Sequence, residues 1–202
     1  MKIRIKFSKH GNTRFIGHLD IMRYFQKAMR RADIPIRYSE GFSPHQIMSF
    51  AAPLGVGVES DSEILDIEIS EKIDPQKALD RLNDVMCEGI RILEWKEMPD
   101  DTKNAMSQVS SADYYIECDC SSLEALNKAE IPVSKETKSG EIKLVDIKPM
   151  IYSAVLKPGG IFIHIAQGST GNLKPDTVMK VLGVNNYHIT RKCLYDANGL
   201  TL

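Results

Sequence analysis

The sequence predicts an α+β protein built from two tandem ferredoxin-like halves of the β-α-β-β-α-β type. Apolar and polar residues alternate over residues 2–7, as in a half-buried strand, and apolar residues recur every three or four positions over 18–32, as in an amphipathic helix. A polar stretch without periodicity follows the first such unit. We therefore predict an N-terminal domain over 1–98, a linker over 99–110 and a C-terminal α+β domain over 111–202.

The N-terminal half carries clear helix boundaries. Pro35 follows the first helix and prevents its continuation, because proline has no backbone N–H. Asp74 suits the N-cap of the second helix, and Pro75 suits its first helical position. The further elements of this half are predicted at residues 36–60 (strand-like, broken by Gly and Pro), 64–69 (a strand), 74–89 (a helix) and 90–96 (a strand).

The C-terminal half is predicted to be a second unit with two helices. Pro158-Gly159-Gly160 joins two apolar runs and indicates a hairpin. Pro175 opens the last helix and Gly183 ends it. The elements of this half are predicted at residues 114–118, 141–156 and 186–195 for strands and at 121–129 and 175–183 for helices.

Length and composition are those of a globular chain: 202 residues, 43% hydrophobic and 26% charged, with a net charge of −1. No apolar run approaches the roughly 18 residues of a membrane span, and the N-terminus lacks the apolar block of a signal peptide. Four cysteines make no disulfide scaffold. We expect a cytoplasmic protein without membrane contact; composition names no function.

Charge is segregated along the chain. Residues 1–60 contain ten Lys/Arg and four Asp/Glu, whereas residues 61–140 contain nine and nineteen. Such segregation produces a basic and an acidic face on one molecule, unless folding averages it out.

The basic residues cluster on one flank of the first predicted helix. Lys and Arg neutralise phosphates and supply most sequence-independent affinity for nucleic acid, and neighbouring aromatic rings can stack on bases. The sequence therefore predicts RNA binding here. The alternative is a solvated flank paired with the acidic middle segment. The predicted RNA-binding residues are Arg23, Lys27, Arg30, Arg31 and, just beyond the helix, Arg37.

A Gly- and Pro-containing loop follows the basic helix. Gly41 permits a positive φ and Pro44 rigidifies the chain, while Phe42 and His45 stay chemically available. Both a recognition loop and a bulge that bends a strand fit this pattern. The predicted recognition residues are Tyr38, Ser39, Gly41, Phe42, Pro44 and His45.

Two histidines and two carboxylates suggest an acid–base or metal site if they converge: His18, Asp20, His45 and Glu63. The alternative is that His18 and Asp20 cap the helix and His45 bonds loop backbone. No fixed ligand spacing is present, so we predict no metal site and no cofactor.

A second anion site is suggested by the loop before the helix at Pro175, because free N–H groups at a helix start favour an anion. An ordinary helix-entry turn is the alternative. The residues concerned are Gly171, Asn172 and Lys174.

Several segments carry a family resemblance: Phe15–Arg23, Ala28–Ala32, Ile34-Pro35, Tyr38–His45, Pro53–Gly57 and Glu63–Ile67, with Asn172–Pro175 and Arg191 further on. Together they resemble the radical-SAM-linked (radical-SAM-associated) bacterial proteins of unknown function, in their stand-alone form. Ser43 and Gln46 depart from that pattern, in which Asn and Pro are expected.

The resemblance implies a radical SAM enzyme as partner. The four cysteines lack the C-x3-C-x2-C spacing that holds a radical SAM cluster, so this chain is not that enzyme. Our leading hypothesis is a non-catalytic, RNA-interacting accessory protein in RNA modification or ribosome-linked RNA processing. The alternatives are an RNA- or nucleotide-directed enzyme using the His/Asp/Glu set, and a protein-interaction module that grips a basic partner with its acidic segment.

Overall fold

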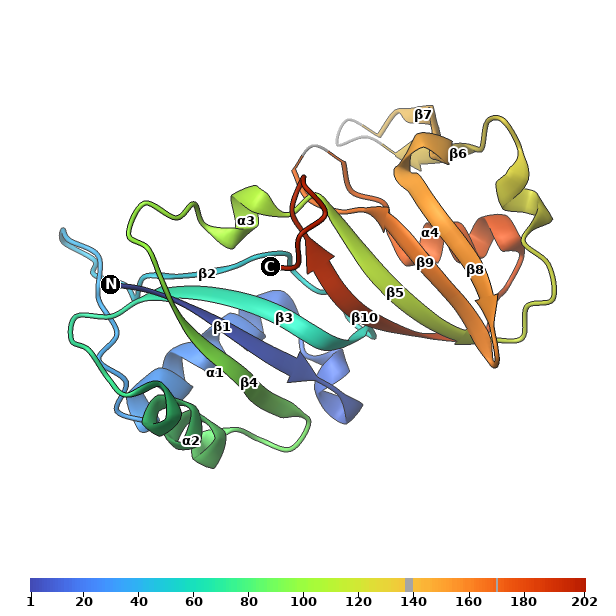
Figure 1. The fold of residues 1–202 in the computed structure, drawn as a ribbon. Helices are drawn as coiled ribbons and strands as arrows, with labels where there is room; N and C mark the ends of the chain where they lie inside the picture. The colour runs from blue at the N-terminus through green and yellow to red at the C-terminus, as the bar shows by residue number, and fades with distance from the viewer. Residues whose placement is uncertain (137–139, 170) are drawn as a thin grey trace.

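One large, mostly antiparallel sheet runs through the protein in the computed structural model, which describes residues 1–136, 140–169 and 171–202 (Figure 1). Its strands are β1 (Lys2–Lys9), β2 (Met48–Phe50), β3 (Glu59–Glu68), β4 (Ile90–Met98), β5 (Ser111–Cys118), β8 (Ile151–Lys157), β9 (Gly160–Ala166) and β10 (Tyr187–Tyr195). Their order is β4-β1-β3-β10-β5-β9-β8, with β2 also pairing with β3. The strands β6 (Pro132–Glu136) and β7 (Ile142–Asp146) form a separate pair.

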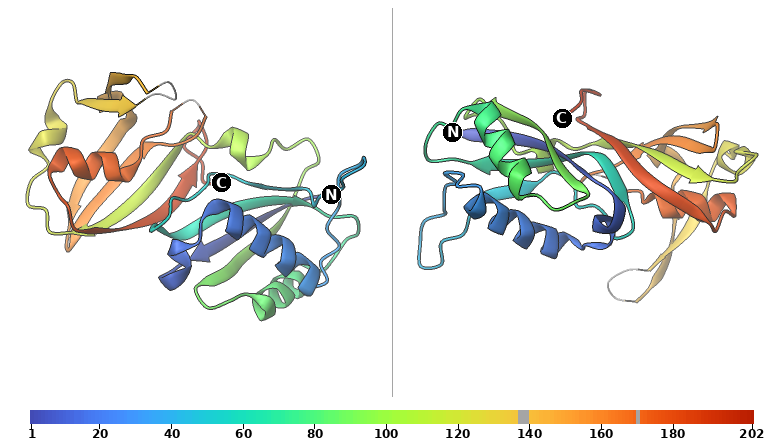
Figure 2. Two further views of the ribbon diagram at one scale, coloured as in Figure 1. Left: turned by 180° about the vertical axis from the view of Figure 1, so that it is seen from behind. Right: turned by 90° about the horizontal axis from the view of Figure 1, so that it is seen from below.

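The helices α1 and α4 lie on the same side of the sheet (Figure 2). The α-helices are α1 (His18–Arg31), α2 (Pro75–Val85), α3 (Ala105–Gln108) and α4 (Pro175–Leu182), and the 3-10 helices are η1 (Gly11–Phe15), η2 (Glu124–Asn127) and η3 (Lys148–Met150). The Asp74 side chain accepts a hydrogen bond from the Lys77 backbone N–H, which confirms the predicted cap of α2. No helix within the described residues has the length and hydropathy needed to cross a membrane.

The first half has its own core. The alternating residues Ile3, Ile5 and Phe7 of β1 are buried, as the period of two predicts. They pack with Phe25 of α1 and Leu82 of α2, both fully buried, so this face of the sheet is closed by the two helices.

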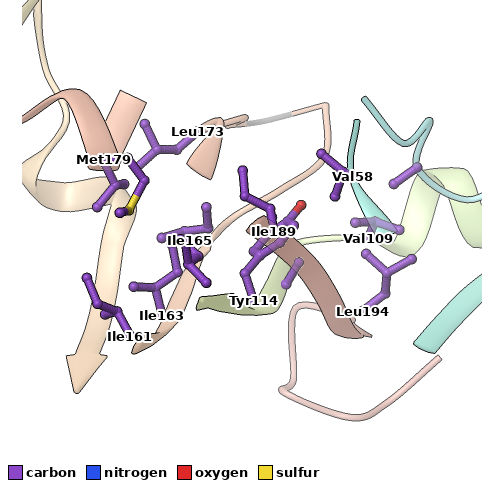
Figure 3. Close-up of a cluster of buried hydrophobic side chains, with 14 of the residues drawn as sticks. Val58, Val109, Tyr114, Ile161, Ile163, Ile165, Leu173, Met179, Ile189 and Leu194 are labelled. Carbon is purple, nitrogen blue, oxygen red and sulfur yellow. The ribbon is translucent and has the colours of Figure 1, made fainter. Parts of the chain in front are cut away.

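The second core lies between β5, β9, β10 and α4. Ile163 and Ile165 of β9 are fully buried against Met179 of α4. Val58, which precedes β3, and Val109, which follows α3, join this cluster beside Tyr114 and Ile189 (Figure 3). The predicted linker 99–110 is therefore packed: it carries α3, and Ala105 and Val109 are buried.

The two halves share the sheet through one short parallel contact. Only two residue pairs join β3 to β10, Glu59 with Thr190 and Ser60 with Arg191. We call this place the seam. Because the sheet continues across it, the two halves form one body.

The prediction of a helix over 121–129 is wrong. The structure has only the 3-10 helix η2 there, so α4 is the one α-helix in the described part of the second half. A helix of so few residues cannot offset the cost of nucleation, and Leu126 is its one buried side chain. The strand β6 was not predicted. Most of residues 36–60 lies outside regular strands, apart from β2 and the first two residues of β3.

Candidate nucleic-acid interface

The basic flank of α1 is exposed. Ile21 and Phe25 face the core, and helical spacing places Arg23, Lys27, Arg30 and Arg31 on the other side, where all four are exposed. Lys27 and Arg30 form no ion pair with any described residue.

The remaining two cations of the flank have weak partners. Arg23 forms an exposed ion pair of 3.3 Å with Asp20, and Arg31 Nη2 donates to the Val85 carbonyl at 3.1 Å. None of the four pairs with an acidic side chain of residues 61–140 in the described part of the chain. The flank therefore retains its positive charge. Arg37 is separate, since it forms an ion pair of 3.1 Å with Glu68.

The loop 38–45 is closed on itself. The Ser39 N–H donates to the His45 carbonyl at 2.8 Å, and Ser39 Oγ lies 2.9 Å from His45 Nδ1. Gly41 has a φ of +107°, which a side chain would disfavour. Phe42 is fully exposed, with Pro44 exposed beside it. The loop is thus a shaped projection that presents an aromatic ring to solvent.

Gln46 ties this loop to the basic helix. Its Nε2 donates to the Gln26 carbonyl of α1 and to the Tyr38 hydroxyl, each at 3.2 Å, and the residue is buried. Gln26 precedes Lys27, so the base of the loop and the basic flank are held next to each other. Gln46, which stands where the resemblance predicts a Pro, thus makes the contact that joins the loop to α1.

The four acid–base candidates lie in different environments. Asp20 is exposed beside Arg23, His45 contacts Ser39, and Glu63 is buried against Arg191. His18 packs edge-on to Phe50, with ring centroids 5.4 Å apart, and shares a very small cavity with Glu63. No hydrogen bond or ion pair joins any two of the four in the part of the chain described. The N-cap of α1 is Gly17, so His18 and Asp20 do not cap it.

A buried ionic network crosses the seam. Arg191 Nε donates to Glu63 Oε1 at 2.9 Å, Arg191 Nη2 donates to the same carboxylate, and Nη2 also donates to the Ala52 carbonyl at 2.7 Å. Burial alone would lower the pKa of Arg191, but the Glu63 carboxylate raises it by more. Lys9 lies near this pair; burial lowers its pKa, and its Nζ donates to the Ile16 carbonyl.

A cavity of about 350 Å³ opens beside this network. Much of its lining comes from segments that carry the resemblance noted above: Pro53–Val56, Asn172, Lys174, Pro175 and Arg191. The predicted anion-site residues Asn172 and Lys174 thus line this cavity, and all three predicted residues, Gly171 included, line a neighbouring cavity together. Lys174 is exposed and forms no ion pair with a described residue, while Asp176 supplies a carboxylate to the same cavity.

A cluster around Glu59 was not predicted. Glu59 contacts His10 Nδ1 at 3.2 Å, His188 Nε2 at 3.1 Å and the Gly11 N–H at 2.8 Å. Burial would raise the pKa of Glu59, but these hydrogen bonds together lower it to about 2. Sequence spacing gave no signal, because the partners are far apart along the chain. Among the described residues no group of His, Cys, Asp or Glu is arranged to hold a metal ion.

Comparison with known families gives a match to one family model over most of the chain. The family model described as "Uncharacterized protein conserved in bacteria (DUF2344)" matches residues 2–175. No curated protein matches the sequence. The matched region contains the basic flank of α1, the loop 38–45 and the segment Asn172–Pro175. The chain therefore belongs to the DUF2344 family of proteins conserved in bacteria.

Proposed function

We propose that this protein binds RNA through the basic flank of α1 and the loop 38–45. The observation that carries the proposal is the direct link between them: Gln46 bonds both Gln26 of α1 and Tyr38 of the loop. Lys27 and Arg30, which have no acidic partner in the part of the chain that the structure describes, therefore lie on a helix tied to a shaped loop.

The chemistry of the two parts is complementary. Guanidinium and ammonium groups neutralise phosphates, whereas an exposed ring such as that of Phe42 offers a stacking surface for a base. His45 lies close to that ring in sequence. This combination suits single-stranded or looped RNA, whose bases are accessible.

We further propose an accessory role beside a radical SAM enzyme that modifies RNA or acts in ribosome-linked RNA processing. This part rests on the sequence resemblance. The missing C-x3-C-x2-C motif favours a partner over the radical enzyme itself. No hydrogen bond or ion pair joins any two of the four acid–base candidates among the described residues, and His18 and Glu63 share only a very small cavity; both observations favour a non-catalytic role.

The strand orders support the tandem ferredoxin-like interpretation of the fold. The first half has the order β4-β1-β3-β2, and the second half has the corresponding order β10-β5-β9-β8. The first crossover helix of such a unit is replaced in the second half by η2, β6, β7 and η3. This interpretation describes architecture and does not by itself carry a function.

The test is the salt dependence of RNA binding. The Arg23→Ala/Lys27→Ala/Arg30→Ala/Arg31→Ala variant and the wild type are titrated with a fluorescent oligo(U) over a range of salt concentrations. For single strands the slope of log K against log salt is roughly −0.7 per phosphate contact, so the variant slope becomes shallower by up to roughly 2.8.

A matched control removes equal charge elsewhere on the surface, through Lys77→Ala/Lys128→Ala/Lys143→Ala/Lys180→Ala. It should retain the wild-type slope, apart from a small effect of net charge. An unchanged slope in the α1 variant would overturn the proposed interface. Capture of a protein partner that survives nuclease and depends on Phe42 would instead favour a protein-interaction module.

A further inference from the structure

Within the described residues, the second half presents a sheet face that no helix covers. The apolar side chains of β5, β9 and β10 pack toward α4, and side chains alternate along strands. The opposite face of β10-β5-β9-β8 is directed toward the viewer in Figure 1, with α4 behind it. Figure 2 shows α4 in front when the molecule is seen from behind. We call this uncovered side the open face.

Aromatic side chains occupy the centre of the open face. Tyr115 of β5 and Phe162 of β9 are directly opposite each other in the antiparallel register, and Val155 of β8 is paired with Phe162. Tyr152 is 54% exposed and Val155 is 49% exposed, and Tyr115 and Phe162 are partly exposed. None of these four belongs to either hydrophobic cluster of the described residues.

A polar row flanks these rings. His164 is paired with Asp113 across β9 and β5, and its Nδ1 lies 2.6 Å from Asp113 Oδ1. The Tyr195 hydroxyl donates to the other oxygen of Asp113, also at 2.6 Å. The His164 ring lies 5.4 Å from that of Tyr152 and 5.2 Å from that of Tyr195, centroid to centroid. The hydrogen bonds to Asp113 thus fix the rings of His164 and Tyr195. His164 Nε2 has no hydrogen-bond partner among the described residues.

Cations border the rings. Lys192 Nζ lies 5.8 Å from the centre of the Tyr115 ring, where it also contacts Asp61. Lys157 is exposed at the end of β8, on the same side as Val155. Glu117 is the exposed acidic residue on this side of β5. A ligand with flat apolar groups and a negatively charged backbone fits this pattern better than an aliphatic protein surface does.

We propose that the open face is a binding site for single-stranded nucleic acid, with bases stacked on Tyr115 and Phe162 and phosphates near Lys192 and Lys157. Some four-stranded sheets bind single-stranded nucleic acid by stacking bases on aromatic side chains of their central strands, and such stacking tolerates any base. The His164 edge can contact a base or sugar. This site lies on the side of the sheet opposite α1, so it does not rest on the interface proposed above.

The test uses the full chain and a fluorescent oligo(U) of twelve nucleotides. Tyr115→Ala/Phe162→Ala should bind the oligonucleotide more weakly, by roughly 5- to 150-fold for each stacked base lost, with an unchanged salt slope because no charge is removed. Phe15→Ala, which removes an exposed ring from η1, is the matched control and should bind like the wild type. Tyr115→Phe/Phe162→Tyr keeps both rings and should retain affinity, which separates stacking from a folding defect.

Ultraviolet crosslinking followed by peptide mapping gives an independent result. Crosslinks in the peptides of β5 and β9 support the open face. Unchanged affinity in Tyr115→Ala/Phe162→Ala, with crosslinks confined to α1 and the loop 38–45, overturns it and leaves the α1 interface standing. If Tyr115→Ala/Phe162→Ala loses affinity and the α1 variant keeps the wild-type salt slope, the open face is supported and the α1 interface is overturned. No binding by the wild type overturns both.

Discussion

Glu63→Gln tests whether the ionic network at the seam holds the two halves together. Arg191 is only 1% exposed and cannot lose its proton, so the substitution leaves an uncompensated buried charge. Breaking one member of a buried pair costs about 3–5 kcal/mol. We expect about 3 kcal/mol, the lower end, because the Gln amide oxygen and the Ala52 carbonyl still accept from the guanidinium.

The assay is urea denaturation with two probes. Trp95, the single tryptophan, is buried in the first half and reports its unfolding by fluorescence, while far-ultraviolet circular dichroism reports the whole chain. The two curves should coincide in the wild type and separate in Glu63→Gln, since the seam is weakened.

The double variant Glu63→Gln/Arg191→Met is the control. It removes both charges and replaces the guanidinium with a flexible apolar side chain, so it should lose less stability than Glu63→Gln alone. A loss below about 1 kcal/mol in the single variant would refute the reasoning, because it would mean that Arg191 is hydrated or finds another partner.

Three further outcomes are expected. The pKa of Glu59 is lowered to about 2, so its contribution to stability is present above pH 4.5 and is lost as the pH falls toward 2. Solvent screens the cluster around Glu59, so we expect urea titrations to show a loss of about 1 kcal/mol in the free energy of unfolding between pH 7 and pH 3. The loss should be smaller in Glu59→Gln, and equal losses would contradict this. Phe25→Ala should cost about 3–5 kcal/mol by the same titration, because the fully buried ring fills the first core; a loss under 1 kcal/mol would show that the site collapses or hydrates. Gly160→Ala should lower the melting temperature by several degrees, because a Cβ there would lie 2.1 Å from the Ile116 carbonyl oxygen, and an unchanged melting temperature would show that the β8–β9 hairpin can shift.

Sequence patterns correctly predicted the helices that depend on interactions between residues close together in the chain. The recurrence of Ile16, Leu19, Met22, Phe25 and Met29 every three or four residues predicted α1, although Ile21 is buried and Leu19 is exposed. Asp74-Pro75 predicted the start of α2. The same helical spacing placed the cations of α1 on one exposed flank. The helix predicted over residues 121–129 was wrong because a short polar run with one buried leucine satisfies a helical pattern without the packing that would stabilise a helix.

The contacts across the seam could not be predicted in this way. Glu63 and Arg191 are 128 residues apart, and nothing in either neighbourhood indicates the other. The alternation of β5 and β9 shows that Tyr115 and Phe162 point away from the core. That they are directly opposite each other follows only from the strand register. Gln46 was seen only as a departure from an expected Pro, because its hydrogen bond to Gln26 depends on the path of the intervening loop.

The single sheet shared by both halves has a geometric consequence for any long, flexible ligand. The α1 flank and the open face are on opposite sides of a continuous sheet, so a short oligomer can occupy one of them but cannot lie flat on both. A strand that engages both has to pass around an edge of the sheet. Two separate segments bound one on each side would instead be held apart by the thickness of the protein.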